Sequence, residues 1–210
     1  DEPYVQEITE AAQGHVACAL ADMTRQNLES ITGRPWADED AMAWFLPYRD
    51  DRADPALAAR YRGLASLPAG TLGREYWEQY QRNGYSFPGE PNGLNEAFAT
   101  PHDCTHVLSG YDTSPRGELL VSTFTAAMHP SRPMEGHILP VIFSWHLGIK
   151  INDVAGSAVG ALDPREFWHA WARGAAITED LFAPGWDFWG CVEERVAALR
   201  DRYGIPPLAE

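Results

Sequence analysis

Signals that start and stop helices recur along the chain and restrict its fold more than any other feature. An aspartate followed by proline, a pair that caps a helix and opens its first turn, occurs at Asp54-Pro55 and Asp163-Pro164. Thr71 precedes a third run of helix-forming residues. Glycine, which commonly ends a helix in the left-handed conformation, follows three runs. These glycines are Gly84, Gly110 and Gly204.

Hydrophobic periodicity favours the same fold class. Apolar residues recur at steps of three, four or their sums between Val5 and Ile31, which predicts one long amphipathic helix ending near Gly33. The run from Val192 to Tyr203 predicts the last helix. Residues 154–159 could form a strand, but their glycine and alanine content disfavours it. We therefore predict an all-α fold, a helical bundle in which residues 1–210 form a single domain.

Composition and charge exclude several classes of protein. The chain has 16 basic and 30 acidic residues, and its formal net charge of −14 disfavours nucleic-acid binding. The longest apolar stretch, residues 138–149, is shorter than the roughly 20 residues that a membrane-spanning helix needs. Three widely spaced cysteines provide neither a disulfide framework nor a zinc-finger spacing. This cysteine usage indicates a reducing compartment, so we expect a cytoplasmic protein, and no export signal is visible in the sequence.

One short segment carries the residues best suited to chemistry. Thr100 and Pro101 predict the start of a helix, with Thr100 as the cap, Pro101 at the first helical position and Asp103 three residues after the cap. At about 100° per residue, His102, Asp103 and His106 would then share one face of the first turns. The pattern predicts a patch of two imidazoles and one carboxylate.

A fourth donor follows in the next predicted helix, which starts at Glu118. If the two helices packed as an antiparallel hairpin, the loop after Gly110 could bring Glu118 opposite the histidine face. Two histidines and two carboxylates suit Zn²⁺, Fe²⁺ or Mn²⁺ and leave room for water or substrate, as in a catalytic site. The spacing alone leaves a second interpretation open, in which the histidines are a surface coincidence and Asp103 only caps a helix.

Further polar residues are weaker candidates. Tyr111 and Arg116 lie on the predicted loop and could orient a bound carboxylate, although solvated loop residues are the alternative. His146 could line a pocket, although a hydrogen-bonded core histidine is the commoner role. Packing or loop roles are expected for the remaining residues, namely Cys104, His129, His137 and His169.

The spacing of the four candidate ligands resembles a known pattern. His102, Asp103, His106 and Glu118 form an H-D-x-x-H-x₁₁-E motif, which resembles that of the Coq4 family of ubiquinone-biosynthesis proteins. The resemblance covers about residues 30 to 207. It extends to four flanking segments, residues 106–111, 117–119, 67–76 and 189–206.

This resemblance implies an all-helical fold and a divalent metal held by His102, Asp103, His106 and Glu118. It also implies an apolar cavity for a prenylated 4-hydroxybenzoate-type precursor, and an oxidative decarboxylation that replaces a ring carboxylate by a hydroxyl. Assembly at the membrane periphery with other quinone-biosynthesis proteins would accompany that role. Iron or manganese would be expected if the protein performs the oxidation, whereas zinc would require another oxidant or a non-redox role.

Three alternatives stay open at this point. The protein could be a non-catalytic scaffold that binds a prenyl lipid, with the metal only joining two helices. It could also act on a smaller aromatic acid in specialised metabolism, because its negative charge suits an anionic membrane surface poorly. A phosphohydrolase is disfavoured, since His15 is the only histidine upstream of the motif. Aromatic residues between 167 and 189 would allow a homo-oligomer.

Overall fold

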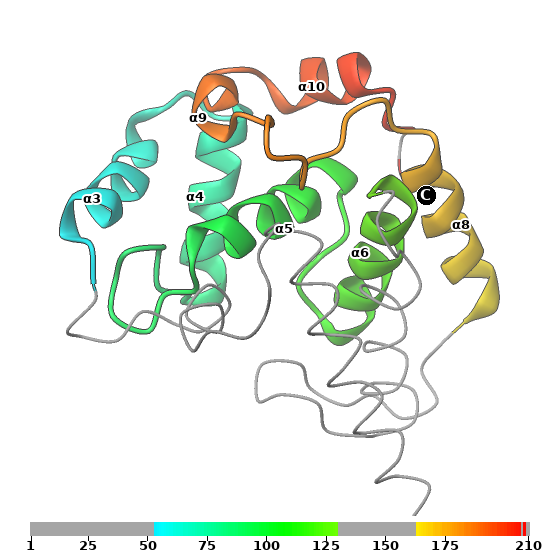
Figure 1. The fold of residues 1–210 in the computed structure, drawn as a ribbon, viewed down its shortest axis with the longest axis horizontal. Coiled ribbons are helices and arrows are strands. Elements are labelled where there is room, and N and C mark those ends of the chain that lie inside the picture. Colours follow the sequence, from blue (N-terminus) through cyan, green and yellow to red (C-terminus); the bar gives the residue numbers. More distant parts are fainter. Residues whose placement is uncertain (1–52, 130–162, 207, 209–210) are drawn as a thin grey trace, which may run out of the picture. The chain divides into compact units, whose positions relative to one another are not determined.

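The computed structural model describes residues 53–129, 163–206 and 208 (Figure 1). In these ranges the regular structure is helical, and β pairing is limited to an isolated bridge between Thr71 and Arg195. The prediction of an all-α fold is therefore confirmed for the described residues. The elements are α3 (Pro55–Gly63), the 3₁₀ turn η2 (Leu64–Ser66), α4 (Leu72–Asn83), α5 (Glu96–Ser109), α6 (Pro115–Met128), α8 (Pro164–Ala175), α9 (Phe188–Cys191) and α10 (Val196–Tyr203).

Some sequence predictions fall outside the described residues. They are the helix between Val5 and Ile31, the apolar stretch 138–149, the candidate strand 154–159, and the roles of His137 and His146.

The chain divides into two compact units, each built from two segments of sequence. One comprises Pro35–Tyr111 with Ala175–Glu210, and the other comprises Asp1–Arg34 with Asp112–Gly174. Of the described elements, α3, η2, α4, α5, α9 and α10 belong to the first unit, and α6 and almost all of α8 belong to the second. The single domain over residues 1–210 stays a prediction.

Most of the predicted helix boundaries are confirmed. Asp54 caps α3 by accepting hydrogen bonds from the backbone N–H groups of residues 56 and 57. Thr71 precedes α4, and α8 begins directly after Asp163. The three predicted glycines each follow the last residue of a helix with positive φ: Gly84 at 66°, Gly110 at 83° and Gly204 at 69°. Glycine adopts this conformation at little cost.

The predicted start of α5 is wrong. Asn95 is the cap, accepting a hydrogen bond from the backbone of Ala97, and the helix begins at Glu96. Pro101 therefore lies inside the helix, where it lacks the N–H that would bond the carbonyl one turn back. Thr100 does not cap, because its buried hydroxyl is 2.6 Å from the Tyr61 hydroxyl. The Thr-Pro pair resembles a helix start, but the helix continues on both sides of it and is held there by tertiary contacts such as that with Tyr61.

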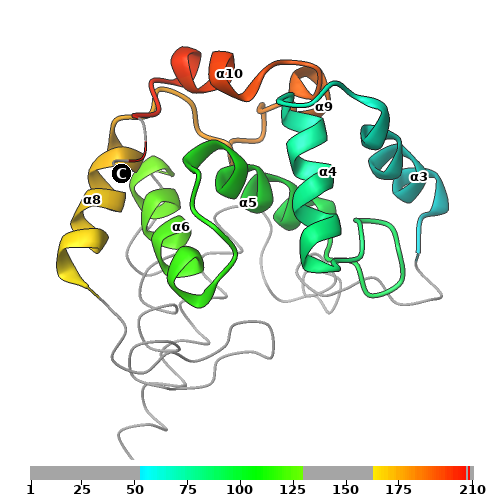
Figure 2. The same cartoon turned by 180° about the vertical axis from the view of Figure 1, so that it is seen from behind.

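Two further helix starts differ from the prediction. Helix α6 begins at Pro115, with the Ser114 hydroxyl accepting from the backbone of Gly117, so Glu118 lies within the first turn. Helix α10 begins at Val196, four residues later than predicted. Residues 192–195 are instead held against the start of α4, where the backbone N–H groups of residues 72 and 73 donate to the carbonyls of residues 194 and 192. Figures 1 and 2 show α9 beside this end of α4.

An aromatic cluster forms the core of the first unit. Its members are Tyr61, Tyr76, Tyr80, Phe87, Phe188 and Trp189. The rings of Tyr80 and Phe87 stack with centroids 4.8 Å apart, and Tyr76 lies 4.7 Å from Tyr80 on the same helix. Aromatic pairs at this separation add to the free energy gained by burying the rings. The cluster joins α3, α4 and α9, and it also fixes the loop that leads to α5.

Helices α6 and α8 approach each other closely in the second unit, as both views show (Figures 1 and 2). A Cβ atom built on Gly174 would lie 2.1 Å from the backbone oxygen of Phe124, so only glycine fits there. Phe167 packs against Ala126, with Trp171 beside them. At the other end of the pair, the Arg116 guanidinium forms two hydrogen bonds with the Glu166 carboxylate.

Candidate metal centre

Two imidazoles lie one turn apart on α5. The Nε2 atoms of His102 and His106 are 3.3 Å apart, and their rings are nearly perpendicular, with centroids separated by 4.9 Å. His106 is buried and His102 is half-buried. The helical spacing of four residues places both side chains on one face, as the sequence predicts.

A backbone carbonyl sets which nitrogen of His106 can bind a cation. Its Nδ1 is 3.1 Å from the carbonyl oxygen of Tyr111, which can only accept a hydrogen bond. Neutral His106 therefore carries its proton on Nδ1, and the Nε2 lone pair points toward His102. Histidines that bind metals commonly donate their other ring N–H to a carbonyl or carboxylate in this way.

Phe98 holds the ring of His102. The two rings are one helical turn apart and stack with centroids 5.4 Å apart and an interplanar angle of 12°. Stacking restricts the orientation of the imidazole, so less rotational freedom is lost when the ring binds a ligand.

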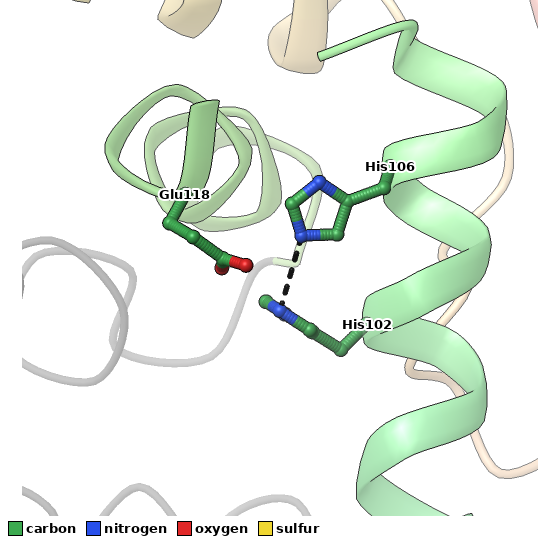
Figure 3. Close-up of side chains that lie close together, drawn as sticks. All are labelled: His102, His106 and Glu118. Atoms are coloured by element: carbon green, nitrogen blue, oxygen red, sulfur yellow. Dashed lines mark hydrogen bonds between the residues drawn. The ribbon is translucent and has the colours of Figure 1, made fainter. Parts of the chain in front are cut away.

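Glu118 completes a group of three donors (Figure 3). Its side chain extends from the first turn of α6, and His102 and His106 extend toward it from α5. One ligand atom from each residue lies within 4.8 Å of the other two. The described residues therefore contain a group of two imidazoles and one carboxylate.

The donor set and the spacing of its nitrogens fit a metal ion. Metal–nitrogen bonds of about 2.0–2.1 Å at a tetrahedral angle separate two nitrogens by about 3.3 Å, close to the observed spacing. Two histidines and one carboxylate form the set that holds non-haem Fe²⁺ in oxygenases, and they also suit Zn²⁺. Three protein ligands leave positions for substrate, water or dioxygen.

Asp103, the fourth predicted ligand, is not part of this group of three. It lies on α5, and its Oδ2 accepts a 2.5 Å hydrogen bond from the hydroxyl of Tyr80 on α4. Tyr76 in turn donates to the Tyr80 oxygen over 2.8 Å. Burial raises the pKa of the Tyr80 hydroxyl, and the Asp103 charge raises that pKa further, so Tyr80 remains protonated and able to donate.

The other residues singled out in the sequence lie outside the group of three donors and differ in their surroundings. Tyr111 is buried, and its backbone carbonyl contacts His106. Arg116, predicted to orient a substrate carboxylate, is paired with Glu166. Burial raises the pKa of the Cys104 thiol, consistent with a packing role. His129 is buried just after α6, and His169 is exposed on α8.

Sequence reasoning overlooked three groups around the histidines. Phe98 and His102 are four residues apart. This spacing would indicate that their rings stack if the sequence placed the start of α5 at Glu96. The Tyr111 carbonyl has no residue-type signal, because every residue has one. The Tyr80–Asp103 hydrogen bond joins residues 23 positions apart, and no local pattern predicts it.

Comparisons with known proteins find a distant structural similarity. No family model and no curated protein matches the chain. The crystal structure of a protein from Nostoc punctiforme, which is described as a ubiquinone biosynthesis protein, is similar to this chain. The similarity covers 97% of this chain and 95% of that one. The two sequences are 20% identical and the TM-score is 0.49.

Among the described helices, none combines the length and the apolar character needed to cross a bilayer.

Proposed function

We propose that this protein is a metal-dependent enzyme of quinone biosynthesis, in which His102, His106 and Glu118 hold a divalent metal ion. Its reaction would be the oxidative decarboxylation of a prenylated 4-hydroxybenzoate-type precursor. The observation that carries the proposal is the grouping of two imidazole nitrogens and a carboxylate oxygen within 4.8 Å of one another. The H-D-x-x-H-x₁₁-E motif, which resembles that of the Coq4 family, supplies the reaction and the substrate class.

The proposed reaction is a two-electron oxidation at one ring carbon. The bond to the carboxyl carbon breaks, carbon dioxide leaves, and a carbon–oxygen bond forms with one atom of dioxygen. The second oxygen atom leaves as water and requires two electrons and two protons from an external reductant. A bound iron or manganese ion would supply the redox chemistry with dioxygen and a positive charge for the substrate oxygens.

The chain's own residues have separate tasks in this scheme. His106 presents its Nε2 lone pair because the Tyr111 carbonyl holds the proton on Nδ1. His102 is oriented by the Phe98 ring. Glu118 supplies the negative charge that two neutral imidazoles lack, and it lies in the first turn of α6, at the positive end of the helix dipole.

Metal analysis of anaerobically purified protein tests the site. We expect about one iron or manganese ion per chain in the wild type, and a loss of at least tenfold in His106→Ala and Glu118→Gln. His169→Ala and Glu193→Gln are matched controls, because both residues are exposed in the structure. Metal content that is equal in all five proteins would contradict the assignment of the ligands.

Oxygen uptake tests the reaction. Protein loaded with iron or manganese should consume dioxygen with prenylated 4-hydroxybenzoate in the presence of a reductant, and should release carbon dioxide in equal amount. Uptake with the unprenylated acid alone would indicate the smaller-substrate alternative. A metal-loaded protein that is inactive with both acids would contradict the oxidative reaction and favour the scaffold role.

A further inference from the structure

The Asp103 carboxylate is buried and directed toward α4. Its residue is only 8% exposed, and Tyr80, which donates to it, is 3% exposed. A buried carboxylate is strongly disfavoured unless hydrogen bonds compensate for its lost hydration. The 2.5 Å bond from Tyr80 provides such compensation, and a bond to a charged group is worth more than one between neutral groups.

The donor of this bond is itself fixed. The Tyr80 ring is stacked on Phe87 at an interplanar angle of 4°, and Tyr85 contacts it edge-on. Tyr76 donates to the Tyr80 oxygen, which leaves the Tyr80 proton for Asp103. The start of α4 is in turn held by the backbone bonds to residues 192 and 194. Tyr80 can therefore direct the carboxylate of Asp103 without moving its own ring.

We propose that Tyr80 keeps Asp103 out of the metal's coordination sphere, so that the ion is held by two imidazoles and one carboxylate. Asp103 is then a positioning residue, which anchors α5 to α4 and so fixes the helix that carries both histidines. The inference rests on the proposed metal site. Its chemical consequence is one more open position at the ion than the motif of four donors implies.

The substrate class follows from the number of open positions. At an octahedral ion, three protein ligands leave three positions, enough for both oxygens of a ring carboxylate together with dioxygen. Four protein ligands would leave two, and the same pair of ligands would compete for them. The arrangement therefore suits a substrate that binds through two adjacent oxygens.

Cobalt titration of the purified protein distinguishes a ligand from a positioning residue. Asp103→Asn keeps an oxygen that can accept from Tyr80 but removes the charge of a ligand. We expect this variant to bind Co²⁺ within about threefold of the wild type, with the visible absorption bands unchanged. Glu118→Gln, which removes the charge of an assigned ligand, should weaken binding at least a hundredfold.

Two further variants each remove the hydrogen bond between Tyr80 and Asp103. Asp103→Ala and Tyr80→Phe should each weaken Co²⁺ binding about tenfold, the usual effect of losing a group that supports a ligand. Because both remove the same hydrogen bond, the double variant should bind no more weakly than either single one. Thermal unfolding of the ion-free proteins should show the same lack of additivity, and this readout does not depend on the metal.

The outcomes separate two failures. If Asp103→Asn loses cobalt affinity as severely as Glu118→Gln, or shifts the absorption bands, Asp103 is a ligand and the inference is wrong while the metal site stands. If the wild type itself fails to bind Co²⁺, the proposed function is wrong as well. Additive effects of Tyr80→Phe and Asp103→Ala would also overturn the anchoring role.

Discussion

Helices α5 and α6 carry the three candidate ligands, but their polar anchors differ in kind. Helix α5 is held by a buried bond from Tyr80 to Asp103, and by two partly buried bonds from the Arg200 guanidinium to the carbonyl oxygens of Val107 and Leu108. The polar anchor of α6 lies at the surface, where the side chains of Arg116 and Glu166 are 61% and 35% exposed.

The two kinds of polar anchor contribute differently to the stability of the helices. An exposed ion pair is screened by water and contributes little, whereas a buried hydrogen-bonded carboxylate becomes costly once its partner is lost. Helix α6 therefore depends on close packing against α8, especially at Gly174. Helix α5 depends on polar bonds in the interior. The two helices should respond oppositely to polar and to steric substitutions.

The largest effect is expected at the buried anchor of α5. Asp103→Ala should lower the free energy of unfolding of the ion-free protein by about 3 kcal/mol, because it leaves the Tyr80 hydroxyl buried without its acceptor. Chemical denaturation with urea measures this change. A loss below 1 kcal/mol would show that the interior bond contributes no more than a surface pair.

A steric change should affect α6 strongly. Gly174→Ala is expected to cost about 2 kcal/mol, because the added methyl group would meet the Phe124 backbone oxygen and the helices must separate. Gly185→Ala is the matched control, since a Cβ there meets nothing within 4 Å. Equal stability of the two variants in urea would contradict the close packing of α6 and α8.

Alkaline pH should lower the free energy of unfolding through a buried tyrosine in the first unit. Burial raises the pKa of Tyr76 well above its ordinary value of 10.0, so the stability linked to its neutral form is complete below about pH 10 and falls as the pH rises further. The loss should approach about 1.4 kcal/mol per pH unit for one such group. Tyr76→Phe should flatten the decline between pH 10 and 11, as followed by urea unfolding at each pH. An unchanged slope would show that Tyr76 does not titrate with unfolding.

The smallest effect is expected at the surface pair. Arg116→Ala should cost about 0.5 kcal/mol at neutral pH and less in high salt. The hydrogen bond from Arg116 lowers the pKa of Glu166, so this small contribution is present above pH 4.5 and is lost as the pH falls through the lowered pKa. Unfolding curves at pH 7 and pH 3 measure it. A cost above 2 kcal/mol at pH 7 would remove the contrast with α5.

The sequence predicts local features of this fold well. Asp54, Gly84 and Gly204 each act within one turn of their own helix, and the structure confirms all three boundaries. The prediction failed at Thr100, because a distant tyrosine occupies its hydroxyl and α5 continues through Pro101. It also failed at Val192, where backbone bonds to α4 replace helical ones.

The candidate site follows the same rule. His102 and His106 could be paired from their spacing because four residues make about one turn of a helix. The position of Asp103 could not be predicted, because its hydrogen-bond partner comes from another helix. Local spacing places a side chain on a face, but tertiary contacts determine which atoms it meets.

The bond between Arg200 and the end of α5 joins residues 92 and 93 positions apart. During synthesis, both histidines leave the ribosome long before the arginine that holds the last carbonyls of their helix. A nascent chain therefore forms this contact only after residue 200 has been synthesised, and a ribosome stalled before that residue would carry an α5 without the hydrogen bonds from Arg200.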